Sequence, residues 1–281
     1  MKVGIVGLGL MGASFGRTVK NKTQDTVYGF DRDQTVMLKA SLINCIDGEL
    51  NKETLPEIDL LIISVYTRDF SSVVNEYLPY LKEGATVLDF CGNKSSVCKS
   101  MKELSKKYEK INFIGGHPMA GREFSGIDHS LKTLFEKASM ILVPIKADIF
   151  TVENIKKYFL LLGFGEVVFT EAENHDKTIA FTSQLCHIVS NAYIKSETAK
   201  EHHGFSAGSY RDLTRVARLN PKMWSELMMD NSEKLSSELD TLIENLKKYQ
   251  SALVKKDEKE LENLLQEGNL LKLEIDARKN K

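Results

Sequence analysis

The chain has 281 residues, of which 42% are hydrophobic, enough for a large core and, we expect, two domains. Lys and Arg total 38 against 39 Asp and Glu, so no basic field would attract nucleic acid or anionic lipid. The sequence starts in a strand-like run and contains no signal segment and no long apolar span, which predicts a cytoplasmic protein that does not enter a membrane.

The remaining composition points away from disulfides and metals. The four cysteines, Cys45, Cys91, Cys98 and Cys186, form no CxxC pair, and we expect them to be free thiols in a reducing compartment. No group of His, Cys or carboxylate residues has the spacing of metal ligands, so no metal is predicted.

Short apolar runs alternate with amphipathic segments over the first 170 residues, the rhythm of strand, crossover helix and strand. Because these runs are apolar throughout, they predict a parallel sheet covered by helices on both faces. The expected strands are 3–6, 27–30, 60–65, 86–89, 113–115, 139–143 and 166–169. From about Glu171 the pattern is helical, at 179–193, 224–246 and from Asp257 to the end. The fold class is therefore α/β: a doubly wound Rossmann-type domain over 1–170, then an all-helical domain over 171–281.

A glycine-rich turn joins the first predicted strand to a helix expected over 13–19. It reads Gly7-Leu8-Gly9-Leu10-Met11-Gly12 and has the form GxGxxG. Gly7 permits a tight turn, Gly9 lets a pyrophosphate approach the backbone, and Gly12 lets the helix pack closely on the strand. The helix N-terminus then faces the anion. The strand before the turn and the helix after it favour a dinucleotide site over a simple tight turn.

Asp31 stands at the end of the second predicted strand, about 20 residues beyond the glycines. A carboxylate there accepts hydrogen bonds from the adenosine ribose hydroxyls, which favours NAD. Arg32 follows directly, and a guanidinium at that position would tolerate the 2′-phosphate of NADP. We expect NAD, with NADP as the alternative.

His117 follows the fifth predicted strand within Gly115-Gly116-His117-Pro118-Met119-Ala120-Gly121. In a doubly wound sheet it would emerge at the carboxyl edge, which also receives the nicotinamide. Oxidation of an alcohol by NAD releases a proton as hydride leaves, and histidine accepts a proton at neutral pH. We therefore expect His117 to be the catalytic base.

At this point the sequence resembles the prephenate and arogenate dehydrogenases, the family that makes the precursor of tyrosine, over nearly its whole length. The segments that carry the resemblance are HPMAG at 117–121 with Glu123 and Ser125-Gly126, His175-Asp176, TSQLCH at 182–187, YRDLTR at 210–215 and PKMW at 221–224. The resemblance implies oxidative decarboxylation of a cyclohexadienyl alcohol to an aromatic product, with His117 deprotonating the 4-hydroxyl.

The resemblance also implies the substrate-binding residues. Arg215 would bind a substrate carboxylate through a bidentate pair. His187 and Ser183 would orient polar groups of the substrate, and Glu123 would pair with a basic residue at the mouth of the pocket. By analogy the helical domain would form a homodimer interface.

One segment departs from the family pattern. Relatives often carry D-x-G-S-x-K after the fourth strand, with a serine that contacts the catalytic histidine, and here residues 89–94 read DFCGNK. Gly92 falls at the serine position, so Cys91, Asn93, water or a substrate group must replace that contact, or His117 is tuned differently. Lys94 matches the pattern and would reach the cofactor or the histidine, or else lie at the surface.

Structural interpretations compete with several of these assignments. His187 lies in an apolar stretch and would also suit a packed core histidine. His175 beside Asp176 is expected to cap or brace a helix. Arg211 and Arg215, four residues apart, would also fit an ion-pair network with Asp212.

The substrate remains open between prephenate and arogenate. Arogenate presents an ammonium where prephenate has a keto group, and residues 182–187 contain no carboxylate to meet it, which favours prephenate. Two further alternatives are a related hydroxyacid-type dehydrogenase and an inactive dinucleotide-sensing protein of the same fold. The absence of the serine at position 92 favours the sensor, and the presence of His117 and Arg215 favours the enzyme.

Overall fold

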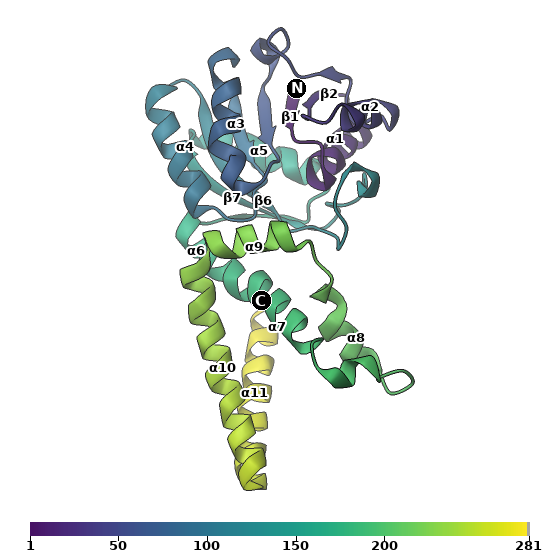
Figure 1. The fold of residues 1–281 in the computed structure, drawn as a ribbon. Helices are drawn as coiled ribbons and strands as arrows, with labels where there is room; N and C mark the ends of the chain where they lie inside the picture. Colours follow the sequence, from purple (N-terminus) through teal and green to yellow (C-terminus); the bar gives the residue numbers. More distant parts are fainter. Residues whose placement is uncertain (280–281) are drawn as a thin grey trace. The chain divides into compact units, whose positions relative to one another are not determined.

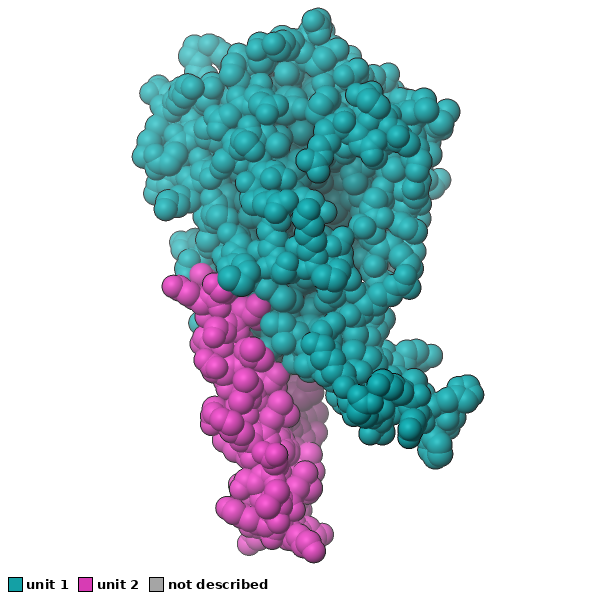
Figure 2. Space-filling model, in the orientation of Figure 1, with its two compact units in different colours: residues 1–231 teal, residues 232–281 magenta. Residues whose placement is uncertain are grey.

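The computed structural model describes residues 1–279, which form two compact units. The first unit runs from Met1 to Asn231, and the second begins at Ser232 (Figure 2). The first unit therefore holds the whole sheet and the helices up to residue 230. The predicted domain boundary at residue 170 is a different division of the chain and stays a prediction.

An eight-stranded sheet forms the centre of the first unit, counted over residues 1–279 (Figure 1). Its strand order is β3-β2-β1-β4-β5-β6-β7-β8. The strands are β1 (Lys2–Val6), β2 (Thr26–Phe30), β3 (Gly48–Glu49), β4 (Leu60–Ile63), β5 (Thr86–Asp89), β6 (Asn112–Pro118), β7 (Ser139–Lys146) and β8 (Glu166–Phe169). The chain crosses from β3 at one edge back past β1 to β4, so the doubly wound α/β fold is confirmed.

The sheet differs from the expected one in two places. The two-residue strand β3 has too little apolar sequence to be seen as a run. β7 runs antiparallel to β6, although every other pair is parallel, so the expectation of a wholly parallel sheet was wrong. Parallel strands need a long crossover, usually a helix, and residues 119–138 between β6 and β7 contain only a 3-10 turn at Ile127–His129.

Helices cover both faces of the sheet, as the apolar runs predict. The helices of this part are α1 (Leu10–Lys22), α2 (Gln34–Leu42), α3 (Phe70–Tyr77), α4 (Ser95–Lys107) and α5 (Ile149–Leu161). Ile5 and Ile62 belong to one buried cluster with Phe15 and Phe159, whereas the next residues, Val6 and Ile63, belong to another with Phe70 and Phe113. Successive strand residues point to opposite faces, so the sheet separates two cores and holds its carboxyl edge rigid.

The rest of the first unit is helical. Its elements are α6 (Ala172–Ile179), a π-helical segment (Ala180–Leu185), α7 (Cys186–Tyr193), α8 (Gly208–Thr214) and α9 (Pro221–Asp230). Short 3-10 turns lie at Leu55–Glu57, Thr67–Asp69, Leu78–Tyr80, Glu197–Lys200 and Arg215–Ala217. Asn220 caps α9 by accepting a hydrogen bond from the Met223 N–H at 3.2 Å, and Pro221 occupies the first helical position. The helix expected over 224–246 is thus two helices, separated at Asn231.

The second unit consists of α10 (Ser232–Lys255) and α11 (Glu258–Lys279). The Tyr249 hydroxyl donates to the Leu264 carbonyl at 3.1 Å and links the two helices. The last predicted helix is confirmed as far as residue 279, and residues 280–281 lie outside the described part. Over residues 1–279, no helix is long and apolar enough to cross a bilayer.

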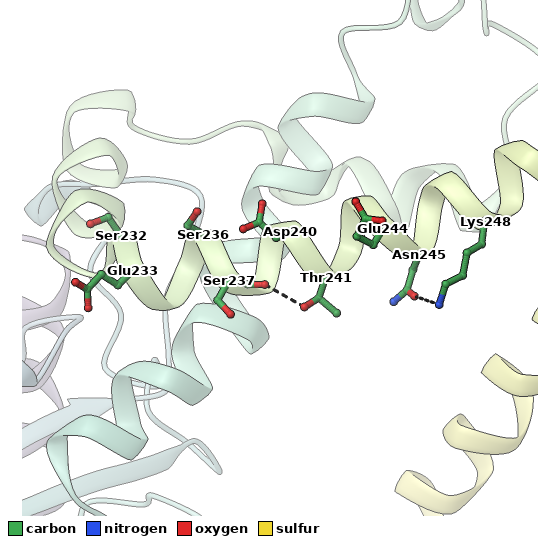
Figure 3. Close-up of a pocket in the computed structure, with 9 residues that line it drawn as sticks. All are labelled: Ser232, Glu233, Ser236, Ser237, Asp240, Thr241, Glu244, Asn245 and Lys248. Carbon is green, nitrogen blue, oxygen red and sulfur yellow. Dashed lines mark hydrogen bonds between the residues drawn. The ribbon is translucent and has the colours of Figure 1, made fainter.

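A shallow pocket lies along the polar face of α10 (Figure 3). The side chains that line it are Ser232, Glu233, Ser236, Ser237, Asp240, Thr241, Glu244, Asn245 and Lys248. Hydrogen bonds at this face stay within the helix, such as that from Thr241 to the Ser237 carbonyl at 3.0 Å. The face has the character of a solvated helix surface rather than of a reactive site.

Candidate active site

The turn between β1 and α1 depends on glycine at two positions. Gly7 has a φ of +90°, and a Cβ there would lie 2.3 Å from the Ser64 carbonyl oxygen. A Cβ on Gly12 would lie 1.9 Å from the Gly7 carbonyl oxygen. Both contacts are with backbone, which cannot rotate away, so any side chain at either position would displace the turn.

Gly9 has a different environment. A Cβ built on Gly9 would meet no atom of the described residues within 4 Å. Gly9 is also the N-cap of α1. The first turn of α1, all of whose residues the structure describes, contains no acidic side chain that would repel an anion. Free backbone N–H groups at a helix N-terminus attract an anion. The turn thus leaves open space in front of those N–H groups, and this space suits a pyrophosphate.

Asp31 directly follows β2 and is half-buried beside the turn. One carboxylate oxygen accepts a hydrogen bond from the Leu8 N–H at 2.8 Å, and the other accepts one from the Asp33 N–H at 3.0 Å. Each oxygen keeps a lone pair for another donor. Arg32, the next residue, is exposed.

His117 lies near the carboxyl end of β6. Strands β1, β4, β5 and β6 are mutually parallel, so their carboxyl ends share one edge of the sheet. The glycine turn follows β1 at that edge, and the segment 90–94 follows β5. The sheet therefore brings His117 to the edge that carries the glycine-rich turn at Gly7–Gly12, the nucleotide turn of the candidate site.

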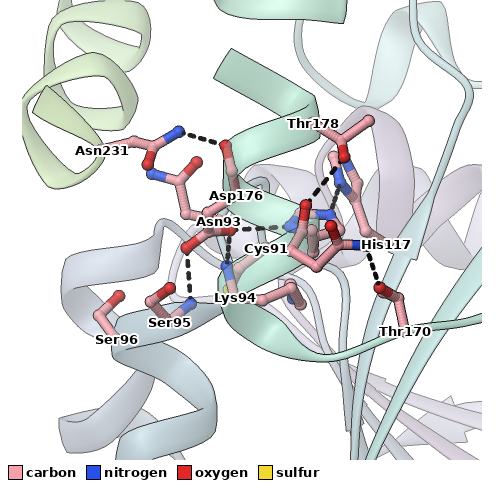
Figure 4. A network of polar contacts seen from close by, with 12 residues as sticks. Cys91, Asn93, Lys94, Ser95, Ser96, His117, Thr170, Asp176, Thr178 and Asn231 are labelled. Carbon is pink, nitrogen blue, oxygen red and sulfur yellow. Dashed lines mark hydrogen bonds and ion pairs between the residues drawn. The ribbon is translucent and has the colours of Figure 1, made fainter. Parts of the chain in front are cut away.

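The His117 ring contacts a second histidine. Its Nδ1 lies 2.9 Å from Nε2 of His175, which is buried in α6. His175 Nδ1 in turn lies 2.7 Å from a carboxylate oxygen of Asp176. Figure 4 shows Asp176 in the polar network that also contains His117 and Lys94. Burial lowers the pKa of His117 well below the usual 6.5, and the neighbouring His175 and Lys94 lower it further. His117 is therefore neutral at neutral pH and able to accept a proton.

Asp176 connects this histidine pair to helix α4. Its carboxylate accepts hydrogen bonds from the backbone N–H groups of Lys94 at 2.7 Å and Ser95 at 2.8 Å. Burial alone would raise its pKa, but the hydrogen bonds from His175, Ser95 and Lys94 outweigh this and lower the pKa to about 2. Burial also lowers the pKa of His175, partly offset by Asp176. Asp176 holds the start of α4 through these backbone hydrogen bonds, as expected of a residue that braces a helix. His175 also contacts His117, which the sequence did not suggest.

Lys94 is completely buried, so its interpretation as a surface lysine was wrong. Its ammonium forms an ion pair with Asp89 and donates to the Gly116 carbonyl oxygen at 2.7 Å. Asp89 also accepts from the N–H groups of Cys91 at 2.9 Å and Gly116 at 3.0 Å. Burial disfavours the ammonium, but the Asp89 carboxylate outweighs it and raises the pKa of Lys94. This charged pair fixes the backbone just before His117.

The space beside Gly92 is filled by a leucine. A Cβ on Gly92 would lie 3.0 Å from a methyl group of Leu227, in α9. The neighbouring Asn93 is buried and its amide binds the Leu227 carbonyl at 2.8 Å and the Asp230 carboxylate at 2.9 Å. Cys91 is buried with its sulfur 3.5 Å from the Val65 carbonyl oxygen. Both side chains proposed to replace the family serine are thus held by other partners.

A buried amide network continues from Asn93 into the helical region. Gln184 donates to Asn93 at 3.0 Å and accepts from Asn231 at 2.9 Å. Asn231 also donates to the Asp176 carbonyl oxygen at 2.8 Å. The network joins the loop after β5 to the π-helical segment and to the end of α9. Such π-helical segments are frequent at functional sites.

The predicted substrate-binding residues Ser183 and His187 lie in and after that π-helical segment, and both are half-buried. His187 Nδ1 donates to the Ser183 carbonyl oxygen at 2.9 Å, which leaves Nε2 as an acceptor in the neutral ring. Burial lowers the pKa of His187, so the neutral form prevails. Its ring stacks on Trp224 with centroids 3.8 Å apart, which fixes its orientation.

Arg215 and Glu123 come together from distant parts of the sequence. An Arg215 nitrogen lies 2.6 Å from a Glu123 carboxylate oxygen, with 63% of the Arg215 side chain and 33% of the Glu123 side chain exposed. The ion pair of Arg215 is thus with Glu123 and not with Asp212. The adjacent Phe124 is partly exposed, and the Arg218 guanidinium lies 5.5 Å from its ring centroid.

The described residues form neither a metal-ligand cluster nor a disulfide. Within residues 1–279, no group of three or more His, Cys, Asp or Glu side chains is arranged to hold a metal ion. All four cysteines lie in this range and none forms a disulfide, with Cys186 exposed and the others buried. The candidate site consists of the glycine-rich turn, the pair of half-buried His117 and buried His175, and the exposed Arg215.

Among the predicted residues, the structure brings His117 to the edge of the nucleotide turn and pairs Glu123 with Arg215. Neither the contact of His175 with His117 nor the amide network of Asn93, Gln184 and Asn231 was predicted from the sequence. The adjacent His175 and Asp176 were a usable signal, because an acidic neighbour often orients a histidine. The amides carried no signal in the sequence.

These features define a Rossmann-type nucleotide-binding protein with a half-buried histidine at the carboxyl edge of its sheet. Comparison with known families is more specific. The family model for the prephenate dehydrogenase nucleotide-binding domain matches residues 15–168, and the model for the dimerization domain of the same family matches residues 171–267. The chain belongs to the prephenate dehydrogenase family.

Individual relatives agree with this assignment. The chain is 31% identical to a cyclohexadienyl dehydrogenase of Zymomonas mobilis over 91% of this chain and 89% of the relative. It superimposes on a prephenate dehydrogenase from Aquifex aeolicus, in complex with hydroxyphenyl propionate and NAD+, with a TM-score of 0.84, 28% identity and 98% coverage of both chains. An arogenate dehydrogenase from Synechocystis gives a TM-score of 0.81 and 25% identity over 98% of this chain and all of that one.

Proposed function

We propose that the protein oxidatively decarboxylates prephenate to 4-hydroxyphenylpyruvate and transfers a hydride to NAD, as a step of tyrosine biosynthesis. The observation that carries the proposal is the position of His117 at the same sheet edge as the Gly7–Gly12 turn. Residues 1–170 would hold the nucleotide, and residues 171–281 would complete the substrate pocket and form a homodimer contact. The proposed setting is the cytoplasm.

NAD is the cofactor of this proposal, and the residues present fit it. The open space at Gly9 would receive the pyrophosphate, and the remaining lone pairs of Asp31 would accept the ribose hydroxyls. Backbone contacts along Leu8, Leu10 and Met11 would complete the cradle. The nicotinamide supplies a hydride acceptor when bound.

His117 would act at the substrate 4-hydroxyl. Because its Nδ1 faces His175, the Nε2 atom is the one left to accept the hydroxyl proton. Removal of that proton raises the electron density on the carbon that loses hydride. Loss of the ring carboxylate as carbon dioxide then gives the aromatic ring, which provides the driving force.

The substrate carries two carboxylates and a ring that must be oriented. Arg215 would bind one carboxylate, because a guanidinium offers two parallel N–H donors. Its present partner Glu123 would exchange with the substrate and so control access to Arg215. Ser183 and the Nε2 atom of His187 would bind polar groups of the substrate.

Arogenate is the second candidate substrate, and one observation favours it. The Glu123 carboxylate lies beside Arg215, so the site contains an acid that could meet the ammonium of arogenate. The relatives include proteins named cyclohexadienyl dehydrogenase and arogenate dehydrogenase. A ratio of kcat/KM for the two substrates decides between them.

The test is a direct assay of the purified protein with NAD and each substrate. NADH absorbance should grow with prephenate or arogenate, and carbon dioxide should appear in equal amount. No NADH with either substrate, in a protein that binds NAD, would overturn the enzymatic proposal in favour of a dinucleotide sensor. Replacing NAD by NADP in the same assay tests the role of Asp31 against that of Arg32.

A further inference from the structure

We propose that His175 and Asp176 are positioning residues for His117. They fix the tautomer of His117 so that its Nε2 atom carries the reactive lone pair. In this chain they would replace the serine that relatives often carry at the position of Gly92. The inference rests on the proposed function for its catalytic consequence. The geometry that supports it lies entirely within the first compact unit. It begins at Asp176 and proceeds through two rings to His117.

The positions of the protons follow from the order of donors and acceptors. Asp176 is ionised and accepts only, so the proton between it and His175 belongs to His175 Nδ1. Neutral His175 then has a lone pair on Nε2, at 2.9 Å from His117 Nδ1. A hydrogen bond at that distance needs one proton, which must come from His117 Nδ1. Neutral His117 therefore carries its own lone pair on Nε2.

Asp176, at the start of this series of hydrogen bonds, is rigidly held. Asp176 accepts from two backbone N–H groups at the start of α4, and its own carbonyl oxygen accepts from the buried Asn231 amide. His175 is 2% exposed, so water does not compete for its ring nitrogens. Because the Asp176 carboxylate is fixed and the His175 ring is shielded from water, the two histidines adopt one set of ring orientations and proton positions.

No other side chain is free to orient His117 from the loop after β5. Gly92 has no side chain, and a methyl group of Leu227 lies 3.0 Å from the position that its Cβ would take. Asn93 is engaged with Leu227, Asp230 and Gln184, and the Cys91 sulfur faces the Val65 carbonyl. The remaining charged groups near His117 are Lys94 and its partner Asp89, which bind the Gly116 backbone. His175 is thus the side chain that contacts the His117 ring nitrogen.

The decisive test is nitrogen NMR of the full-length protein labelled in histidine, with the His117 signals assigned by their loss in His117→Asn. The wild type should show His117 protonated on Nδ1 and unprotonated on Nε2. In His175→Ala the tautomer should become mixed, and in His175→Gln, whose amide oxygen can still accept, the Nδ1–H form should persist. His203→Gln, at an exposed histidine, is the control and should leave the His117 signals unchanged.

The kinetics of the same variants give a second readout. His175→Ala should lower kcat by about 10- to 100-fold with little change in KM, and His175→Gln should recover part of the loss. Wild-type His117 protonated on Nε2, or an unchanged tautomer in a folded His175→Ala, would overturn the inference. The NMR result is independent of turnover, so an absence of NADH formation by the wild type would count against the proposed function alone. If His175→Ala fails to fold, the wild-type tautomer still decides.

Discussion

The nucleotide turn and the histidine network lie at the same edge of the sheet but are built from different materials. The turn is built from backbone atoms and depends on the absence of side chains at two positions. A Cβ at Gly12 would collide with the Gly7 carbonyl oxygen, and a Cβ at Gly9 would occupy the space proposed for the ligand. The network around His117 uses buried side chains that satisfy one another, from Asp89 and Lys94 to Asp176 and Asn231.

The two regions are therefore sensitive to opposite kinds of substitution. A backbone cradle is damaged by adding atoms, and a buried polar network is damaged by removing them. In the network, the loss of one partner leaves a desolvated group without compensation. The following predictions add atoms to the turn and remove them from the network.

The largest stability effect is expected at the buried ion pair. Lys94→Met leaves the Asp89 carboxylate buried without its ammonium, and the free energy of unfolding should fall by about 3–5 kcal/mol. Lys99→Met, at an exposed position of α4, the helix that Lys94 precedes, should change it by less than about 0.5 kcal/mol. Denaturant unfolding measures both, and equal values for the two variants would contradict the role of the pair.

Two glycines of the turn should respond in opposite ways. Gly12→Ala places a Cβ against the Gly7 carbonyl oxygen and should destabilise the protein by about 1–3 kcal/mol. Gly9→Ala meets no described atom, so stability should be unchanged while NAD affinity falls at least about tenfold, because the methyl group enters the pyrophosphate space. Thermal unfolding and NAD titration separate the two effects. A Gly9→Ala protein with normal NAD affinity would remove the turn from the nucleotide site.

Arg215 should matter for binding more than for the chemical step. If Arg215 binds a substrate carboxylate as proposed, Arg215→Ala removes that charge-assisted pair and should raise KM about 10- to 100-fold with a smaller change in kcat. Arg211→Ala, one helical turn earlier and also exposed, is the matched control and should leave KM nearly unchanged. Steady-state kinetics with the preferred substrate make the comparison, and a loss confined to kcat would assign Arg215 a different role.

A smaller effect is expected in the pH profile. A base must be unprotonated to act, and burial lowers the pKa of His117 below the usual 6.5. The midpoint of the acid limb of the kcat/KM profile should therefore lie at a pH lower than 6.5. His175→Ala admits water and removes a neighbouring ring, so it should move the limb to higher pH. A wild-type limb above pH 6.5 would show that the site does not depress the pKa of His117.

The same contrast explains what the sequence could predict. The nucleotide turn is one contiguous segment between a strand and a helix, so its residues and its place in the fold were predictable from spacing. His117 could be proposed as the base because it lies near the carboxyl end of a strand, at the sheet edge that carries the turn. The doubly wound sheet followed from apolar runs that are covered on both faces.

The network could not be predicted, because its members are joined only by the fold. Lys94 and Asp176 are 82 residues apart and meet through a backbone N–H at the start of a helix. Asn231 contributes through an amide at a break between helices that helical periodicity does not mark. Packing against Leu227 decides what surrounds Gly92, and that contact depends on the placement of α9. The antiparallel β7 likewise depends on the absence of a crossover helix within a loop.

The activity of His117→Asn, in a protein that still binds its ligands, tests whether His117 is the catalytic base. The amide keeps a polar group at the sheet edge but cannot accept the hydroxyl proton at neutral pH. We predict that kcat falls about a thousandfold while NAD affinity and substrate KM stay within about threefold of the wild type. Turnover close to that of the wild type would contradict the account, because the proton would then leave by another route.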